Sequence, residues 1–254
     1  MKEIIEGLNL PKQILDKTSA FMSKLLGPSI NEFSELYADK VRFKRLKNQV
    51  KIFNKTRELL EENGLEPQEL NLKTLVPLLE KSSVEDTEFL QNKWANLIAN
   101  ISTTPESGLE PRLINTLSSL SSLEAKILDF IHEDFCVRRD LRIANQMNNL
   151  FSTKQLTEKD IKLDDITILF KSVKENFSLD YEFSKIYIDN LESLGLLRYE
   201  EPEIEIDNGT TSADLEDDED QTINLELDIS ANYYSSDDFH LTAFGNYFIN
   251  QCKY

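Results

Sequence analysis

Residues 29–62 read SINEFSELYADKVRFKRLKNQVKIFNKTRELLEE, with no glycine or proline among them. Ser29 and Glu32 form a capping box, which predicts that a helix begins here. Gly64 follows the stretch, and glycine readily adopts the left-handed backbone that ends a helix. A helix over 29–62 would be about 50 Å long. We therefore expect one long central helix, around which the first part of the chain packs.

An apolar seam runs along this predicted helix. Its members recur at steps of three or four residues with one step missed, and they are Leu36, Phe43, Leu46, Val50, Phe53 and Leu60. This spacing places them on one face, where partner helices can cover them. We expect Phe43 and Phe53 to be among the least exposed side chains of the protein.

The same stretch is strongly basic, with eight Lys and Arg and no acid between Lys40 and Arg57. Five lysines at steps of three or four residues share one side, and we name this set the lysine stripe: Lys40, Lys44, Lys47, Lys51 and Lys55. In a chain of net charge −18, the lysine stripe is a candidate surface for nucleic acid, anionic lipid or the chain's own acids. The alternative is a solvated helix face lying near acids of neighbouring helices. A candidate polar node lies in the same block: Asp39, Arg42 and Arg45.

The composition indicates a folded protein of a reducing compartment. Hydrophobic residues make up 40% of the chain, enough for a packed core. Cys136 and Cys252 are too few for a disulfide framework or a cysteine-rich zinc site. The first residues lack the pattern of a signal peptide, and no run approaches the ~20 apolar residues that span a bilayer. We expect a cytoplasmic protein.

Residues 11–26 predict an amphipathic helix that begins after Pro11. One interpretation is a helix lying on the surface of the inner membrane, which would make the protein peripheral to that membrane. The other is an ordinary helix packed against the central one. The polar face, which carries both signs of charge, favours packing.

Between Gly64 and the middle of the chain, local patterns predict shorter helices. A short helical segment is interrupted by, or begins at, Pro77. Ser83 with Asp86 predicts the start of the next helix, in which Trp94 falls on the apolar face as a core residue. We expect the helical N-terminal domain to comprise residues 1–117.

The second half, 118–254, predicts a winged-helix-like α+β domain. Ser121 with Glu124 caps a helix, weaker patterns suggest helices near 138–150 and 158–175, and a further helix ends at Gly195. Two alternating segments then predict strands over 196–207 and 222–230, with a disordered acidic loop at about 207–221 between them. Thr242 caps a closing helix. Helices followed by a two-stranded wing are typical of this relative of the helix-turn-helix, so the expected class is mainly α with a small β component.

The sequence offers little for catalysis. His132 and His240 are the only histidines, and neither has the spacing of a metal motif; phosphate-binding and nucleophile motifs are absent as well. We predict no catalytic, cofactor-binding or metal-binding residue, and no enzymatic activity. The helix that would enter DNA carries three acids against Lys185, and 15 acids with no base follow in residues 200–240. Such a surface repels phosphates.

Several blocks resemble the abortive-infection alpha family of bacteria. They are KLLGPSINEFSELYADKVRFKRLKNQVKIFNKTRELLEENGLEP, LKTLVPLLEKSSVEDTEFLQNKWANLIANI, LEPRLINTLSSLSSLEAKILDFI and the closing LTAFGNYFINQC. The resemblance covers about 24–131 and 239–252. It implies resistance to bacteriophage by stopping growth or killing the infected cell, and it carries over no catalytic residue or cofactor.

These patterns lead to one expected function with alternatives. We expect an anti-phage protein that acts without catalysis, by contacts with phage or host proteins or with further copies of itself. The alternative is an effector that binds membrane or nucleic acid through the N-terminal helix and the lysine stripe. We also hypothesise that the acidic loop docks on the lysine stripe of its own chain and competes there with an anionic partner.

Overall fold

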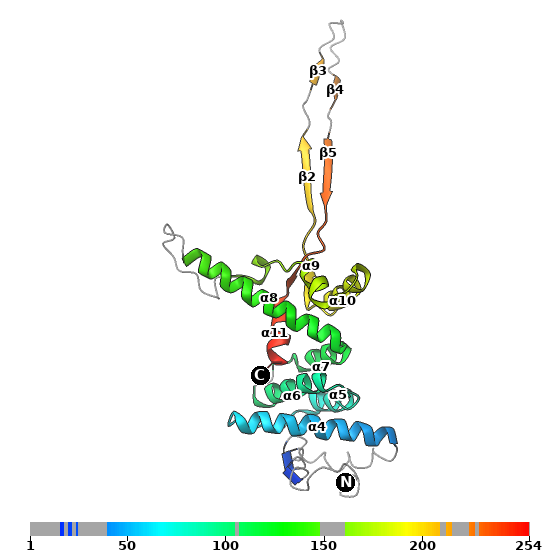
Figure 1. Ribbon diagram of the computed structural model, residues 1–254, viewed down its shortest axis with the longest axis vertical. Coiled ribbons are helices and arrows are strands. Elements are labelled where there is room, and N and C mark those ends of the chain that lie inside the picture. Colours follow the sequence, from blue (N-terminus) through cyan, green and yellow to red (C-terminus); the bar gives the residue numbers. More distant parts are fainter. Residues whose placement is uncertain are drawn as a thin grey trace.

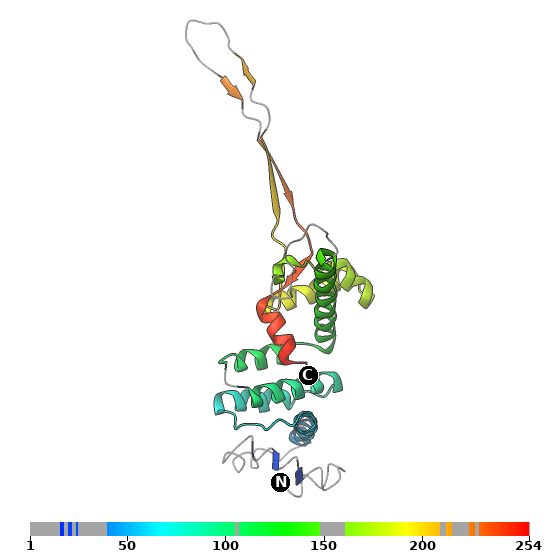
Figure 2. The same cartoon turned by 90° about the vertical axis from the view of Figure 1, so that its left-hand side faces the viewer.

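The computed structural model describes residues 16, 17, 20, 21, 24, 40–104, 107–147, 161–208, 212–214, 224–226 and 229–253. Within these residues the chain is mainly helical, with a small antiparallel β component. The helices stack in layers along one axis, and a β-hairpin projects from one end of the stack (Figure 1; Figure 2). Helix α4 (Lys40–Glu62) lies at the opposite end.

Helix α4 packs on a layer of three shorter helices, chiefly on α6. These are α5 (Leu72–Ser82), α6 (Glu88–Thr103) and α7 (Glu110–Ser119). The seam of α4 faces this layer: its described members Leu46, Val50, Phe53 and Leu60 are all buried. Leu36 and the side chain of Phe43 lie outside the described part. The helix ends before Gly64, which has a positive φ of 64° as expected.

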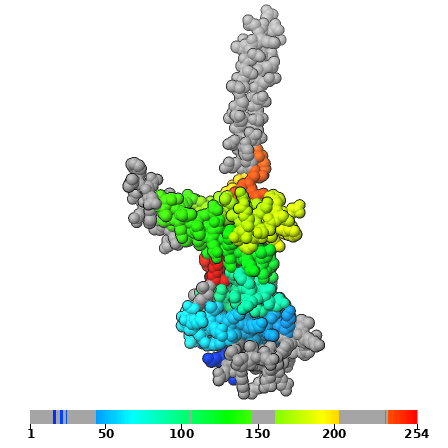
Figure 3. All heavy atoms as spheres, viewed as in Figure 1, coloured from blue at the N-terminus to red at the C-terminus, as the bar shows by residue number. Residues whose placement is uncertain are grey.

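The long helix predicted over 29–62 is described only in part. Its described part is α4, with 23 residues, and 29–39 lie outside the described residues, so the full length stays a prediction. Helix α8 (Ser122–Met147) is a second long helix, with 26 residues. The separate helix predicted near 138–150 is therefore wrong in its start, because α8 continues unbroken through this region. Its first half is buried, and its second half extends beyond the body (Figure 3).

The predicted start of α6 was wrong by a few residues. Ser83 is instead the residue that ends α5, where its hydroxyl donates to the carbonyl of Glu80 at 2.7 Å. Helix α6 begins after Thr87, and Asp86 pairs with Lys44 of α4. Pro77 lies inside α5 without ending it. Trp94 is buried in the core, as predicted.

The N-terminal segment contacts the body at two described positions, Phe21 and Lys24, and Lys24 pairs with Glu66. Phe21 is buried, and its ring lies 6.2 Å from that of Phe53. This contact favours the packed interpretation of residues 11–26, most of which lie outside the described part. None of the described helices is both long and apolar enough to cross a membrane.

The second half follows the predicted order of elements. After α8 come a 3-10 turn, η4 (Leu163–Asp165), and helices α9 (Phe170–Phe177) and α10 (Tyr181–Ser193), the latter ending at Gly195 with φ of 74°. Strand β1 (Leu197–Tyr199) pairs antiparallel with β6 (Phe239–Leu241), and an isolated bridge joins Ile168 to Phe239. The chain closes with α11 (Ala243–Gln251), and the predicted caps at Glu124 and Thr242 are both present.

Strand pairing extends into the segment predicted as an acidic loop. Strand β2 (Glu203–Asn208) pairs with β5 (Ile229–Tyr234), and β3 (Ser212–Asp214) pairs with β4 (Asn224–Glu226). Strand β3 thus lies inside the predicted loop of 207–221; most of that loop lies outside the described residues, and its disorder stays a prediction. The partner of β2 also lies later in the chain than the predicted 222–230 strand, with Ile204 opposite Tyr233.

The core is continuous along the stack. One cluster of buried side chains extends from α4 to α11, and α11 packs against both α6 and α8. Asn96 and Asn100 of α6 donate to the carbonyls of Cys252 and Gln251, which completes the end of α11. These contacts tie the last helix to the layer next to α4. The division into domains near residue 117 stays a prediction.

Candidate functional site

The lysine stripe lies close to acids of the segment that leads into α6. Lys44 donates to Asp86 at 2.7 Å, and Lys55 lies 3.5 Å from Glu88. Lys44 also lowers the pKa of Asp86, by its hydrogen bond and by its charge. Lys47 and Lys51 are exposed, and no ion pair to either is found within the described part of the chain. The side chain of Lys40 lies outside that part.

The stripe therefore borders a surface of mixed charge. Lys51 and Lys55 line an open groove together with three acids, Glu58, Asp86 and Glu88. The hairpin strands β2 and β5 project from the other end of the molecule, far from α4 (Figure 1). In this conformation the described part of the hairpin does not reach the lysine stripe (Figure 1). Most of the acidic loop lies outside the described residues, so its docking, at least transient, on the stripe stays a hypothesis.

The predicted polar node is described only at Arg45, which has a structural role. Its Nε donates to Ser83 Oγ at 2.8 Å, and its Nη2 donates to the carbonyl of Glu80 at 3.2 Å. Asn48 and Gln49 donate to the carbonyls of Ser83 and Leu79. Three polar side chains of α4 thus donate to groups at the end of α5 and hold the two helices together. Asp39 and the side chain of Arg42 lie outside the described residues.

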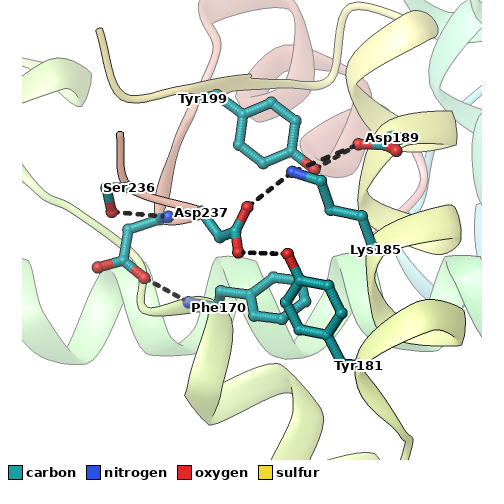
Figure 4. Close-up of polar contacts among 8 residues, drawn as sticks. Phe170, Tyr181, Lys185, Asp189, Tyr199, Ser236 and Asp237 are labelled. Atoms are coloured by element: carbon teal, nitrogen blue, oxygen red, sulfur yellow. Dashed lines mark hydrogen bonds and ion pairs between the residues drawn. The ribbon is translucent and has the colours of Figure 1, made fainter. Parts of the chain in front are cut away.

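A denser set of polar contacts joins α10 to the base of the hairpin (Figure 4). We name it the hairpin-base cluster: Tyr181, Lys185, Asp189, Tyr199 and Asp237. Lys185 Nζ donates to Asp237 Oδ1 at 2.8 Å and lies 3.9 Å from the centre of the Tyr199 ring. The hydroxyl of Tyr199 donates to Asp189, and that of Tyr181 donates to Asp237 Oδ2 at 2.8 Å. The ammonium of Lys185 is therefore enclosed by acids and an aromatic face.

The neighbouring residues attach the end of the hairpin to α9. Asp238 accepts a hydrogen bond at 2.8 Å from the backbone N–H of Phe170, the first residue of α9. Ser236 Oγ accepts from the N–H of Asp238 (Figure 4). The segment 236–238 thus connects the hairpin to two helices, through an N-terminal cap on α9 and the cluster on α10.

The pKa values in the cluster reflect this mutual pairing. Burial lowers the pKa of Lys185, but its hydrogen bonds to Asp237 and Tyr199 outweigh burial and raise the pKa above the usual range. Burial and the bond to Asp189 raise the pKa of Tyr199. The bond from Lys185 lowers the pKa of Asp237, although burial opposes it. Lys185 is therefore charged and paired with Asp237 at neutral pH.

The outer face of α10 combines apolar and acidic side chains. Phe183 is 54% exposed and Ile186 is 58% exposed. Glu182 and Asp189 are exposed on the same helix, whereas Ser184, Ile188 and Leu191 face the core. The sequence identified Lys185 as the one base of this helix, but it gave no local pattern that marked Asp237 as its partner.

Among the described residues, the histidines and cysteines form no recognisable site. His132 Nδ1 lies 3.3 Å from Lys253 Nζ, and burial followed by the charge of Lys253 lowers the pKa of His132. Cys252 is buried, which raises the pKa of its thiol to about 12. Within the residues that the structure describes, no three His, Cys, Asp or Glu side chains are grouped so as to hold a metal ion.

A comparison of the sequence with models of protein families gave a match over most of the chain. The family model for abortive infection alpha matches residues 39–252 of the 254-residue chain. The chain belongs to the abortive infection alpha family. The match spans both α4 and the hairpin-base cluster, and it confirms the resemblance seen in the sequence. A search of curated proteins and a search of solved structures returned no match.

Replacing Asp237 with Asn in this abortive infection alpha protein should lower stability in a pH-dependent way. The folded pKa of Asp237 lies below its usual value of about 3.9. Its charge therefore stabilises the fold above that pH, and this contribution disappears as the pH falls through the folded pKa. Because the pair is partly exposed, we expect Asp237→Asn to cost about 1–2 kcal/mol at pH 7, between the values for exposed and buried pairs.

Denaturant unfolding of both proteins between pH 7 and pH 3 checks this expectation, and the difference should shrink below about pH 4. Asp164→Asn is the matched control, because Asp164 pairs with Arg198 on the surface. It should change stability by less than about 1 kcal/mol. Equal stability of Asp237→Asn and the unaltered protein at pH 7 would contradict a stabilising role for the cluster.

Proposed function

We propose that this protein defends bacteria against phage through protein contacts made by a winged helix, without enzymatic activity. The order α8, α9, α10, β1, hairpin and β6 supports the winged-helix assignment, and the bridge between Ile168 and Phe239 supplies a third strand position. In DNA-binding relatives, the helix in the position of α10 is the one that enters the major groove. The question is therefore what this helix contacts here.

The proposal rests on one observation: the ammonium of Lys185 is already bound by Asp237. A helix that binds DNA needs basic side chains whose charge is available to phosphates. Lys185 is the one base of α10, and its ammonium is bound by Asp237 beside Tyr199. What α10 exposes instead are Phe183, Ile186 and acids. Exposed apolar side chains favour contact with protein, whereas the acids repel nucleic acid.

The contacts of the cluster also support a non-enzymatic role. A catalytic acid or base needs its reactive atom within reach of a substrate proton. In the hairpin-base cluster the polar atoms face other members of the cluster: Lys185 donates to Asp237, and the Tyr199 hydroxyl donates to Asp189. Their shifted pKa values follow from this pairing, which holds the hairpin on α10.

The test is phage challenge of cells that express the protein. We expect the unaltered protein to reduce plaque number together with survival of infected cells. The double variant Phe183→Ser/Ile186→Ser should abolish this protection, because it removes both apolar side chains of the contact face. The matched control is Val137→Ser/Leu141→Ser, which alters an equally exposed apolar pair on α8. Thermal melting should show that both variants fold, since neither alters a buried side chain.

Protection that survives in Phe183→Ser/Ile186→Ser would refute the role of α10. Protection that is lost equally in both double variants would show a general sensitivity to surface changes, and it would also refute a specific role for this helix. Loss in the α10 variant alone supports the proposal.

A second candidate function uses the lysine stripe. Lys47 and Lys51 are exposed without an ion-pair partner among the described residues, so they remain able to contact an anionic surface. If they do, Lys47→Gln/Lys51→Gln should weaken sedimentation of the protein with anionic vesicles. Added salt should have the same effect, because screening shortens the range of electrostatic attraction. Unchanged sedimentation of the variant, or none by the unaltered protein, would exclude the lipid surface as the partner.

A further inference from the structure

The outer face of α10 is suited to a particular kind of partner. We propose that it binds a basic amphipathic helix of another protein, with apolar side chains seated on Phe183 and Ile186 and flanking Lys or Arg near the acids of α10. This inference rests on the proposed function for the statement that α10 meets protein. It adds the chemical class of the partner.

The apolar part of the surface consists of two side chains on one helical turn. Phe183 and Ile186 are three residues apart, so they are neighbours on the helix surface. Both are more than half exposed, while the opposite face of α10 is buried through Ser184, Ile188 and Leu191. Side chains at this spacing form a ridge, and the ridge of one helix packs into the groove between ridges of another. A partner helix is therefore the element that best covers both residues at once.

The charges around this ridge specify a basic partner. Glu182, Asp189 and Glu192 of α10 are all exposed. Asp189 accepts from Tyr199 and lies 3.9 Å from Lys185. Glu182 and Glu192 are therefore the acids of this helix for which the described residues supply no ion pair. Opposite charges across an interface raise the association rate and select the partner, whereas like charges exclude it. A helix that carries Lys or Arg beside its apolar face would cover the ridge and also pair with the acids.

The same charges disfavour a second copy of this chain as the occupant. Pairing of α10 with α10 of another copy would bring Glu182 and Asp189 near the same acids of the second chain. Such a symmetric contact places identical surfaces against each other. Here both surfaces carry negative charge, so they repel. The apolar ridge alone would have to overcome this repulsion.

The surface is also held in place before any partner arrives. Asp180 caps the start of α10 by accepting from the N–H of Phe183, and Asn190 donates to Glu124 of α8. The hairpin-base cluster attaches the middle of the helix to the segment after β5. A contact face fixed in this way loses little conformational freedom on binding. The ridge is thus ready to receive a helix without rearrangement.

The experiment uses synthetic helical peptides and the full chain. One labelled peptide has leucines on one face flanked by lysines, a second has glutamates in place of the lysines, and a third has the lysines with a scrambled order that destroys the apolar face. Fluorescence anisotropy at physiological salt should show binding of the first peptide only. Phe183→Ser/Ile186→Ser should weaken that binding by about tenfold or more, and Val137→Ser/Leu141→Ser should leave it unchanged.

The charge requirement is tested separately. Glu182→Gln should weaken binding of the lysine peptide by a few-fold at low salt, and the difference should decrease as salt is added. Glu182 makes no described contact that holds the fold, so this variant reports on charge alone.

Four results would overturn the inference: no binding of the lysine peptide, equal binding of the glutamate or scrambled peptide, equal binding by the Phe183→Ser/Ile186→Ser variant, or tighter binding of duplex DNA than of the lysine peptide. The phage challenge separates this failure from that of the proposed function. If protection depends on Phe183 and Ile186 but the lysine peptide does not bind, then α10 meets protein of another kind and only the partner class is wrong. If protection is independent of both residues, the proposed function fails as well.

Discussion

Phe53→Ala is expected to lower the free energy of unfolding by about 3–5 kcal/mol, the usual cost of truncating a fully buried Phe. The side chain is completely buried in the seam of α4, and its ring contacts that of Phe21. Removing the ring leaves a cavity between α4 and the layer of α5, α6 and α7. Close-packed interiors fill such cavities only in part. For a chain of this size, the midpoint of thermal unfolding should fall by about 10 °C.

Thermal and denaturant unfolding measure this effect. Lys47→Ala is the control on the same helix, because Lys47 is exposed; it should change stability by no more than about 0.5 kcal/mol. A Phe53→Ala protein that melts within about one degree of the unaltered protein would show that the seam faces water.

Local signals in the sequence predicted the elements well. The capping box at Ser121 and Glu124, the cap at Thr242 and the glycines that end α4 and α10 all have the expected geometry. Such signals succeed because donor and acceptor lie within a few residues, so chain connectivity alone brings them together. The prediction of the apolar seam succeeded for a similar reason, because helical spacing fixes which side chains share a face.

The failures involve partners that are distant in sequence. Ser83 and Asp86 have the spacing of a cap, but α4 recruits both: Arg45 bonds to Ser83, and Lys44 pairs with Asp86 across 42 residues. Tertiary contacts override a weak local preference in such cases. The strand opposite β2 was misplaced because alternating patterns fit either 222–230 or β5, and nothing local sets the pairing register.

The candidate site shows the same limit. The sequence supplied the acidic, apolar composition of α10 and its single Lys185. The state of that lysine depends on Asp237, which lies 52 residues away, beyond the hairpin. Only the fold shows that Asp237 binds the ammonium, and this pairing supports the proposal that α10 contacts protein and not DNA. Composition therefore suggested the function class, and a long-range ion pair provided its main support.

Gly245→Ala should destabilise the protein by about 3 kcal/mol, at the upper end of the range for overpacking a well-packed site. Gly245 lies within α11, where replacing glycine by alanine would normally stabilise a helix by about 1 kcal/mol. Here a Cβ would lie 2.1 Å from the backbone oxygen of Leu196. That carbonyl accepts from the N–H of Thr242, and the Thr242 hydroxyl accepts from the N–H of Gly245. Neither backbone segment can withdraw without breaking these bonds.

The sign of the change in stability distinguishes overpacking against Leu196 from the gain in helix propensity. Asn250→Ala is the control in the same helix, because Asn250 is exposed and only helix propensity should matter there. Denaturant unfolding should show that Asn250→Ala is neutral or slightly stabilising, whereas Gly245→Ala is strongly destabilising. If Gly245→Ala instead stabilised the protein, α11 could not lie as close to the turn at Leu196 as the structure has it. The contact between α11 and Leu196, which precedes β1, would then need revision.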